Sequence, residues 1–498
     1  MLLKDFPQEC WESIFKFLGQ GKDLESVSMV CKKFLSITNQ VKFSLTIHDS
    51  TILFLSRLLS RFLRLKAIDF SHFNGELEDI LHQISQSGLD LDLINLSNQR
   101  TLPVDGLREL GTKMINLRVL ICSNVGSLRD SHLNCRSLEE ISFFQCFKIS
   151  QDGIASAIRM RPSLSSISFN IEKKRIHGPG LTPLPINLDL IDSFVSLKRL
   201  NAIDLSNSFI SDEFLISVAD GAVNFLKKLV LQDCCNFTFS GIFYVLSKCQ
   251  YVQSLDLRKA DFLTDQCINK LSIFLINLTS INLSGCCQLT NSTFFILTRN
   301  CPLLLEIKME RTYIGVEGEE DSNSMSDFVV NRQVKAVHLG DNILLNDASL
   351  IKFTSICAGL QLLDLNACEG ITGECVAEVM KRCYVIRHLN IAYTGIEKFE
   401  INFEVSQLKV LNLSGARIED ESLSIISKWC SGLMLLDIQN CWYVTAKGVR
   451  EVIENCIALK ELNLRNCSLV DDDFVCGLMH ARPSLRKIIT PSGVDFYG

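Results

Sequence analysis

The stretch LTSINLSGCCQLT, residues 278–290, decides the fold because its pattern returns along the chain. It places apolar residues at offsets zero, three and five and a cysteine at offset eight. The pattern L-x-x-L-x-L-x-x-C begins again at residues 226, 252, 278, 304, 334, 360, 386, 408, 433, 459 and 485, mostly in steps of 26. Self-similarity at this period predicts an array in which each repeat supplies one strand and one helix.

Weaker copies extend this register toward the N-terminus and give 17 repeats in total. They begin at Leu65, Leu91, Leu117, Leu138, Leu164 and Leu200, and a degenerate opening copy is expected at Phe43, Leu45 and Ile47. The steps from 164 to 200 and from 304 to 334 are long, at 36 and 30 residues. They predict binding or disordered loops at residues 172–190 and 315–327, and the acidic, serine-containing second loop permits regulation by phosphorylation.

Each half of a repeat has its own periodicity. Because side chains alternate along a strand, Leu278, Ile281 and Leu283 should face inward. Their neighbours should line an exposed concave face: Thr279, Ser280, Asn282, Ser284 and Gly285. Apolar residues at offsets 16, 19 and 23 then predict a helical stripe packed on the sheet: Ile242, Val245 and Cys249; Phe294, Leu297 and Cys301; Val376, Val379 and Cys383; Val449, Val452 and Cys456. Thr264, Thr290, Thr372 and Thr445 are the expected helix caps.

Twelve of the 21 cysteines fall on repeat positions. Those at offset eight are Cys146, Cys234, Cys286, Cys368, Cys441 and Cys467. Those at offset 23 are Cys249, Cys301, Cys357, Cys383 and Cys456, and Cys430 takes the equivalent place in a shorter repeat. No pair has C-x-x-C spacing and no H-E-x-x-H motif occurs, so zinc binding has little support. We interpret these cysteines as small packed side chains and predict no metal site.

Composition excludes several other classes of protein. A net charge of −6 in 498 residues argues against a nucleic-acid partner, which would require a basic face. No long uncharged apolar run predicts a membrane span, and Lys4, Asp5 and Pro7 interrupt any signal-peptide core. We therefore expect a cytoplasmic or nuclear protein with reduced thiols. Phosphate-loop and serine-hydrolase motifs are also missing from the sequence, so we expect no enzyme activity.

Residues 1–40 do not fit the repeat and read as short helices. In FPQECWESIFKFLGQGKDLESVSMVCKKFL, residues 6–35, Pro7 suits a first helical turn and Gly19-Gln20-Gly21 a helix end. Asp23 is the expected cap of the next helix. The apolar residues at helical spacing are Trp11, Ile14, Phe15, Leu18, Leu24, Val27 and Val30. Taken alone, this segment is either a cap that closes the first repeat or a surface for a partner.

The 26-residue repeat with cysteine at offset eight resembles the cysteine-containing leucine-rich repeats, over roughly residues 40–490. In that family such repeats often follow an F-box, and the N-terminal order resembles one: Phe6-Pro7, Glu9, Ile14-Phe15, Leu18, Asp23-Leu24, Val27, Val30-Cys31-Lys32 and Phe34. The family commonly has leucine before the proline and tryptophan in place of Phe34. The resemblance implies an α/β repeat fold: an F-box at 1–40, a curved solenoid of about 17–18 repeats at 41–490 with parallel strands concave and helices convex, and a tail at 491–498.

The same resemblance implies the substrate-recognition subunit of an SCF-type ubiquitin ligase. The F-box would bind a Skp-type adaptor, which joins a cullin and a RING subunit, and the repeats would hold a protein destined for ubiquitin-dependent degradation. The implied adaptor-binding or F-box core residues are Phe6, Pro7, Ile14, Phe15, Leu18, Leu24, Val27, Val30 and Phe34. Two alternatives stay open: a non-catalytic interaction scaffold, and a small-molecule receptor like the plant auxin receptors, which carry an inositol phosphate.

Two sets of residues are candidates for substrate binding. Lys227, Lys228, Arg258 and Lys259 occupy exposed offsets in two neighbouring repeats, with Lys198 and Arg199 just before a third. Such a basic patch would suit an acidic or phosphorylated segment, although charges on a solvated face are also common. Rim aromatics are the second set, because exposed aromatic residues often anchor interfaces: Phe144, Tyr313, Tyr393, Trp442 and Tyr443.

Overall fold

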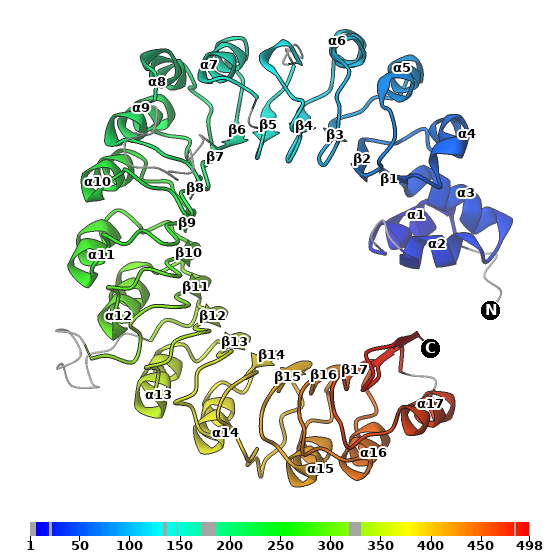
Figure 1. Ribbon diagram of the computed structural model, residues 1–498, viewed down its shortest axis with the longest axis vertical. Coiled ribbons are helices and arrows are strands. Elements are labelled where there is room, and N and C mark those ends of the chain that lie inside the picture. The colour runs from blue at the N-terminus through cyan, green and yellow to red at the C-terminus, as the bar shows by residue number, and fades with distance from the viewer. Residues whose placement is uncertain are drawn as a thin grey trace, which may run out of the picture. The chain divides into compact units, whose positions relative to one another are not determined.

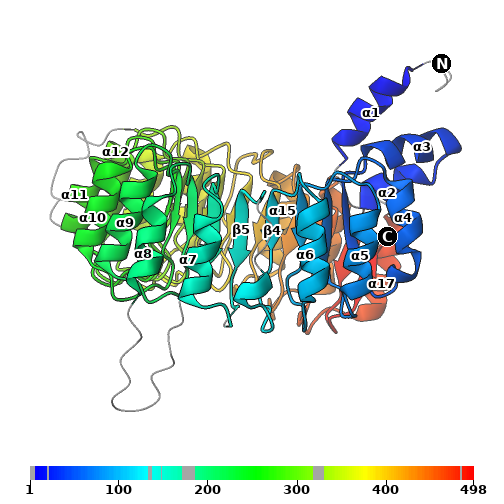
Figure 2. The ribbon, with the colours of Figure 1, turned by 90° about the horizontal axis from the view of Figure 1, so that it is seen from above.

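The computed structural model describes residues 6–18, 22–132, 137–146, 148–170, 186–317, 330–482 and 485–497. The chain divides into two compact units, Met1–Cys249 and Gln250–Gly498. Each unit is a leucine-rich-repeat solenoid, with parallel strands on one side and helices on the other (Figures 1 and 2). Most of the two predicted insertions, at residues 172–190 and 315–327, lies outside the described residues.

The first unit begins with three short helices, α1 (Gln8–Lys16), α2 (Lys22–Ser28) and α3 (Lys32–Val41). The repeats follow as β1 (Ser44–His48), η1 (Ile52–Phe54), α4 (Leu55–Arg61), β2 (Ala67–His72), α5 (Glu78–Gln86), β3 (Leu93–Asn95), α6 (Val104–Lys113), β4 (Val119–Ile121), η2 (Asp130–His132), β5 (Glu140–Phe143), α7 (Gln151–Arg159), β6 (Ser166–Phe169), α8 (Leu188–Val195), β7 (Ala202–Asp204), α9 (Asp212–Ala222), β8 (Lys228–Val230) and α10 (Phe239–Lys248). Strands β1 to β8 pair in chain order, each parallel to the next. The boundary predicted near residue 40 falls where α3 gives way to β1, and it stays a prediction.

The second unit continues the same alternation. Its elements are β9 (Ser254–Asp256), α11 (Asp265–Ser272), β10 (Ser280–Asn282), α12 (Asn291–Asn300), β11 (Glu306–Lys308), β12 (Ala336–His338), α13 (Asp347–Ile356), β13 (Leu362–Asp364), α14 (Gly373–Arg382), β14 (His388–Asn390), β15 (Val410–Asn412), α15 (Asp420–Trp429), β16 (Leu435–Asp437), α16 (Ala446–Asn455), β17 (Glu461–Asn463), α17 (Asp472–Ala481), β18 (Lys487–Ile489) and β19 (Asp495–Tyr497). Strands β9 to β18 are parallel in chain order. The last strand, β19, lies within the predicted tail and pairs antiparallel with β18.

Strand register follows the repeat numbering, with a register shift between Thr46 and His48 where β1 pairs with β2. Ile281, at offset three, pairs with Leu255 on one side and Ile307 on the other, and all three side chains are buried. The weaker upstream copies keep the same register, and the degenerate opening copy pairs Leu45 with Ile68. A one-residue slip would turn the buried side chains to the other face, so the apolar pattern fixes the pairing. The predicted inward positions of the repeats are therefore confirmed. The prediction that Ser284 lines the exposed concave face was wrong, because Ser284 is buried and its hydroxyl accepts from Glu310 N (3.2 Å) of the next repeat.

The helix predictions that the described residues test are confirmed except at one point, and the helix end predicted at Gly19-Gln20-Gly21 lies outside those residues. The four quoted triplets at offsets 16, 19 and 23 are buried. Thr264, Thr290, Thr372 and Thr445 each accept a backbone N–H as N-cap residues. The prediction for Asp23 was wrong, because this residue lies inside the first turn of α2. A carboxylate is favourable there as well, since it faces the positive end of the helix dipole, so the two placements look alike in sequence.

The residue at offset seven holds a left-handed backbone conformation in repeat after repeat. Positive φ angles occur at Asn98, Asn124, Gln145, Asn207, Asp233, Lys259, Gly285, Arg311, Asp341, Ala367, Tyr393, Gly415, Asn440 and Asn466. This conformation aims the N–H at the following repeat: Arg311 N donates to Gly340 O (3.1 Å) and Tyr393 N to Ser414 O (2.7 Å). The turn thus extends the ladder of backbone hydrogen bonds beyond the short strand.

The cysteines at offset eight are hydrogen-bond donors as well as packed side chains. Each thiol donates to the carbonyl at offset five of the preceding repeat: Cys146 to Cys122 (2.6 Å), Cys234 to Leu205 (2.9 Å), Cys286 to Leu257 (3.3 Å), Cys368 to Leu339 (3.1 Å), Cys441 to Leu413 (3.2 Å) and Cys467 to Ile438 (3.1 Å). Two amides replace the thiol elsewhere: Gln99 donates to Phe70 O (2.7 Å) and Asn342 to Met309 O (2.7 Å). Position eight therefore supplies a buried donor that joins consecutive repeats, which a purely apolar side chain could not do.

Burial keeps these thiols protonated. Desolvation raises the pKa of Cys286, Cys368 and Cys441 to about 12, and that of Cys467 to about 11. The thiolate is the nucleophile and the metal ligand, so a raised pKa makes a thiol inert at neutral pH. This supports the structural interpretation of the repeat cysteines.

The rate of alkylation should differ between the two members of each adjacent cysteine pair, Cys234–Cys235 and Cys286–Cys287. Cys234 and Cys286 are buried, whereas Cys235 and Cys287 are exposed. In the native chain at pH 7.5 we expect iodoacetamide to label Cys235 and Cys287 at least about a hundredfold faster than their buried neighbours. Peptide mass spectrometry over a time course measures both rates in the same tryptic peptides. Labelling of Cys286 as fast as Cys287 would show that the ladder of thiols opens readily, and denaturation should abolish the difference.

Candidate partner-binding surfaces

The three N-terminal helices have a core of their own. Phe15, Leu24, Ile37 and Val41 are buried, and Trp11, Leu18, Val27 and Phe34 pack around them. The Trp11 and Phe34 ring centroids are 4.7 Å apart, and those of Phe15 and Phe34 are 5.0 Å apart. Of the nine predicted adaptor-binding or core residues, Phe15, Leu18, Leu24, Val27 and Phe34 therefore belong to the core.

The other four predicted residues face outward. Phe6, Pro7, Ile14 and Val30 are exposed, with 47% of Ile14 and 66% of Val30 accessible. Two further apolar residues join them that the sequence reasoning missed, Phe17 at 91% and Met29 at 81% exposed. Both lie outside the helical stripe of apolar residues that faces the core. An apolar residue outside that stripe is the sequence signal that could have identified them. A small helical segment with a complete core still presents several bare apolar side chains, and such patches mark interaction sites.

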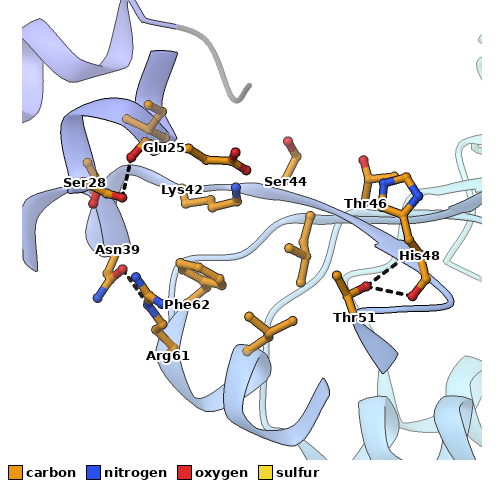
Figure 3. Close-up of a pocket in the computed structure, with 14 residues that line it drawn as sticks. Glu25, Ser28, Asn39, Lys42, Ser44, Thr46, His48, Thr51, Arg61 and Phe62 are labelled. Atoms are coloured by element: carbon orange, nitrogen blue, oxygen red, sulfur yellow. Dashed lines mark hydrogen bonds between the residues drawn. The ribbon is translucent and has the colours of Figure 1, made fainter. Parts of the chain in front are cut away.

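A pocket of about 680 Å³ lies where these helices meet the first repeat (Figure 3). Its lining comes from α2, α3, β1 and α4 and includes Glu25, Lys42, His48, Arg61 and Phe62. Lys42 Nζ and Arg61 Cζ lie 5.6 and 5.1 Å from the centroid of the Phe62 ring, within the range of cation–π contacts.

Polar contacts also join the helices to the repeats. Arg61 Nε donates to Asn39 Oδ1 (2.8 Å) between α4 and α3, and Arg64 lies 3.7 Å from the Glu12 carboxylate of α1. Two of the three helices, α1 and α3, thus contact the first repeat, and a partner bound to α1–α3 would be held near that repeat.

The predicted basic residues are divided between the two units. Lys227 and Lys228 lie at the start of β8 in the first unit and are exposed. Arg258 and Lys259 follow β9 in the second unit, where Arg258 is half-buried and Lys259 is exposed with φ +60°. Each pair lies on the strand side of its own unit, and a single patch made of both stays a prediction.

The predicted rim aromatics are mostly exposed. Phe144 in the first unit is half-buried, while Tyr313, Tyr393, Trp442 and Tyr443 in the second are about half exposed or more. Tyr393 is the most firmly positioned of these aromatic residues, because its hydroxyl accepts from Asn440 Nδ2 (3.0 Å) and its ring covers Gly415. A Cβ at Gly415 would come within 2.4 Å of that ring. Their role in binding a substrate stays a prediction.

One group among the described residues has the composition of a metal site. Glu310, His338 and Asp364, from three consecutive repeats, offer ligand atoms that all lie within 4.8 Å of one another. His338 Nε2 is also 3.3 Å from Glu306 Oε1, but it is buried and makes no hydrogen bond to the described residues. We assign no metal to this group.

No helix in the described part of the chain is both long and apolar enough to span a bilayer. No protein-family model matches the chain. Three curated proteins are similar to it: F-box/LRR-repeat protein 4 of Bos taurus (27% identical, 40% of this chain and 34% of that protein), DNA repair protein rhp7 of Schizosaccharomyces pombe (22%, 56% and 50%) and F-box protein SKIP1 of Arabidopsis thaliana (25%, 34% and 60%). The matches thus span between a third and three fifths of those relatives.

Solved structures with a similar fold include TLR13 in complex with ssRNA13 and Rad7 in complex with Elc1 from yeast. The first has a TM-score of 0.49 at 15% identity over 87% of this chain and 71% of that chain. The second has a TM-score of 0.42 at 15% identity over 89% and 90%.

Proposed function

We propose that this chain, which is similar to F-box/LRR-repeat protein 4 and F-box protein SKIP1, is the substrate-recognition subunit of an SCF-type ubiquitin ligase. In this proposal α1–α3 bind a Skp-type adaptor, and the adaptor connects the chain to a cullin and a RING subunit. The repeats bind a protein that is marked for degradation. The proposed locations are the cytoplasm and the nucleus.

The observation that carries the proposal is the split between core and surface in α1–α3. Phe15 and Leu24 close the core, each with 2% of its surface accessible, so the core requires no partner to be complete. Ile14, Phe17 and Val30 nevertheless remain exposed. Covering apolar surface removes it from water at roughly 25 cal/mol per Å², which favours a protein partner at this place.

The proposed mechanism needs no catalytic residue from this chain. A subunit that holds a target lysine near a ubiquitin thioester turns an encounter between two molecules into a nearly intramolecular reaction. The attachment of α1–α3 to the first repeat, through Arg61 with Asn39 and Arg64 with Glu12, suits this role. It would fix the distance between the adaptor and the first repeats.

The adaptor surface can be tested without disturbing the core. We expect Ile14→Asp with Val30→Asp to lower the amount of co-purified Skp-type adaptor at least about tenfold, since each change places a charge in an apolar interface. The measurement is affinity purification of the full chain with quantitative mass spectrometry of the adaptor and cullin. Phe15→Ala is a poor choice for this test, because removing this buried side chain would unfold the segment and so lower adaptor binding indirectly.

The matched control is Ile115→Asp with Ile457→Asp, which changes two residues that are 73% and 75% exposed in the repeats. It should leave the adaptor bound. If the chain recovers no adaptor at all, the proposal fails and an interaction scaffold becomes the better interpretation. Recovery of adaptor and cullin without any ubiquitinated partner would also favour the scaffold.

A further inference from the structure

A cationic pocket opens at one edge of the sheet in the second unit, away from the residues that the sequence had singled out. Its volume is about 480 Å³, and it lies between β12 and β15 at the ends where these strands begin. The lining consists of Arg332, Lys335, Ala358, Gly359, Gln361, Tyr384, Val385, Arg387 and Gln407. This set contains three cations and no carboxylate.

Backbone pairing places the cations side by side. Gln361 N donates to Lys335 O, Arg387 N to Gln361 O and Lys409 N to Arg387 O, each at 2.8 Å. These four residues share offset one on consecutive strands, and neighbouring strands lie about 4.8 Å apart. Their side chains therefore form a row along the edge, and the repeats that follow add Lys460 and Arg486 at the same offset.

The positive charges of this pocket have no carboxylate partners in the described part of the second unit. Lys335 Nζ donates to Arg332 O (3.1 Å), which holds the ammonium beside the pocket. Gly359 leaves the space for it, since a Cβ there would lie 3.0 Å from Lys335 Nζ. Arg332 and Arg387 are exposed, and the ion pairs between described residues of this unit use other cations, such as Arg311 and Arg382.

We propose that this pocket binds a phosphorylated side chain within an acidic segment of a partner protein. A phosphoryl group carries a charge near −2 and three acceptor oxygens, and it matches several guanidinium and ammonium donors better than a single carboxylate does. Tyr384, which is 72% exposed, offers a ring beside Arg387 for the peptide to cover. The identification of that partner as a ubiquitination substrate rests on the proposed function.

A protein segment fits this edge better than a nucleic acid does. The chain as a whole has a net charge of −6 and would repel a long polyanion, whereas a short peptide meets only the local row of cations. Uncharged Gln361 and Met434 interrupt the row. The row is thus discontinuous, as suits a few phosphates at chosen positions.

The test compares three degenerate peptide libraries that differ only in a fixed central residue: phosphoserine, glutamate or serine. The full chain, purified with whatever adaptor it retains, is immobilised and the bound peptides are quantified. We expect retention of the phosphoserine library to exceed that of the serine library by about tenfold. Arg332→Glu with Arg387→Glu should lower it to the serine level.

The matched control reverses Lys381 and Lys447, two exposed cations on helices α14 and α16, to glutamate. It should leave phosphopeptide retention unchanged. Equal retention of the phosphoserine and serine libraries would overturn the inference. It would also be overturned if the control variant lost as much phosphopeptide retention as the variant with Arg332→Glu and Arg387→Glu. Retention of the glutamate library as well as the phosphoserine library would make this a carboxylate site, and competition by a single-stranded RNA would make it a nucleic-acid site.

The amount of adaptor, measured in the same preparations, separates this inference from the proposed function. If the adaptor is retained but no phosphopeptide is bound at the pocket, only the inference fails. If phosphopeptides bind at the pocket but no adaptor is recovered, only the proposed function fails.

Discussion

Replacing Asn342 with alanine is expected to lower the free energy of unfolding by about 3–5 kcal/mol. The side chain is fully buried, and its amide nitrogen donates to Met309 O (2.7 Å) and Leu339 O (2.8 Å). Its oxygen accepts from Thr312 N (2.7 Å). Alanine would leave the buried Thr312 N–H without an acceptor, which costs about 1–3 kcal/mol. It would also remove one of two donors from each carbonyl, at about 1 kcal/mol apiece, since Met309 O keeps the Thr312 hydroxyl (3.1 Å) and Leu339 O keeps the Cys368 thiol (3.1 Å).

Cysteine at the same position should recover part of the loss. Asn342 occupies offset eight, where Cys368 of the next repeat donates to Leu339 O from the same place. We therefore expect Asn342→Cys to be less destabilising than Asn342→Ala, although both remove the amide. Urea unfolding of the full chain measures the order, with Asn402→Ala, an exposed site, as the control. If Asn342→Ala and Asn402→Ala lower the free energy of unfolding equally, the buried amide contributes nothing to stability.

Phe294→Ala is expected to cost about 3–5 kcal/mol by leaving a cavity instead of unpaired polar groups. Phe294 is fully buried in α12, and its ring centroid lies 4.3 Å from that of Phe353 in α13. Phe295 lies 5.5 Å from Phe353 and encloses the same cluster. Removal of the central ring takes away packing on both helices.

Hydrogen exchange can show where this loss falls. Repeats contact mainly their neighbours, so Phe294→Ala should lower protection in α12 and α13 far more than in the first unit. Phe243→Ala, at a residue that is 37% exposed, is the matched control and should have a smaller effect. An equal effect of the two substitutions on the urea midpoint, or a uniform loss of protection, would contradict a local cavity.

The repeat register could be predicted from sequence because it depends on strict spacing. Ile281 and Leu283 are buried because the residues at offsets three and five of each repeat face the same core. The amide substitutes at offset eight could not be predicted in this way. Asn342 and Gln99 match neither an apolar nor a cysteine pattern. Only the structure shows that each donates, as the thiols do, to the carbonyl at offset five of the preceding repeat.

The candidate adaptor surface was only half predictable, for a similar reason. In short helices a three-to-four spacing identifies apolar residues but does not settle which side packs against a neighbouring helix. Ile14 and Phe15 are adjacent in sequence, yet one is 47% exposed and the other 2%. The tertiary arrangement of α1, α2 and α3 makes that distinction, and it also adds Phe17 and Met29 to the surface.

The left-handed turn at offset seven limits how the array could change in length during evolution. An inserted or deleted residue before that turn would move the N–H of Arg311 or Tyr393 away from the carbonyl that accepts it. Changes after the turn carry no such cost. The step from 386 to 408 shows the result, since no helix lies between β14 and β15 and yet the strands pair in register. A gene encoding such a chain can therefore lose a whole helix from a repeat more easily than one residue from its strand.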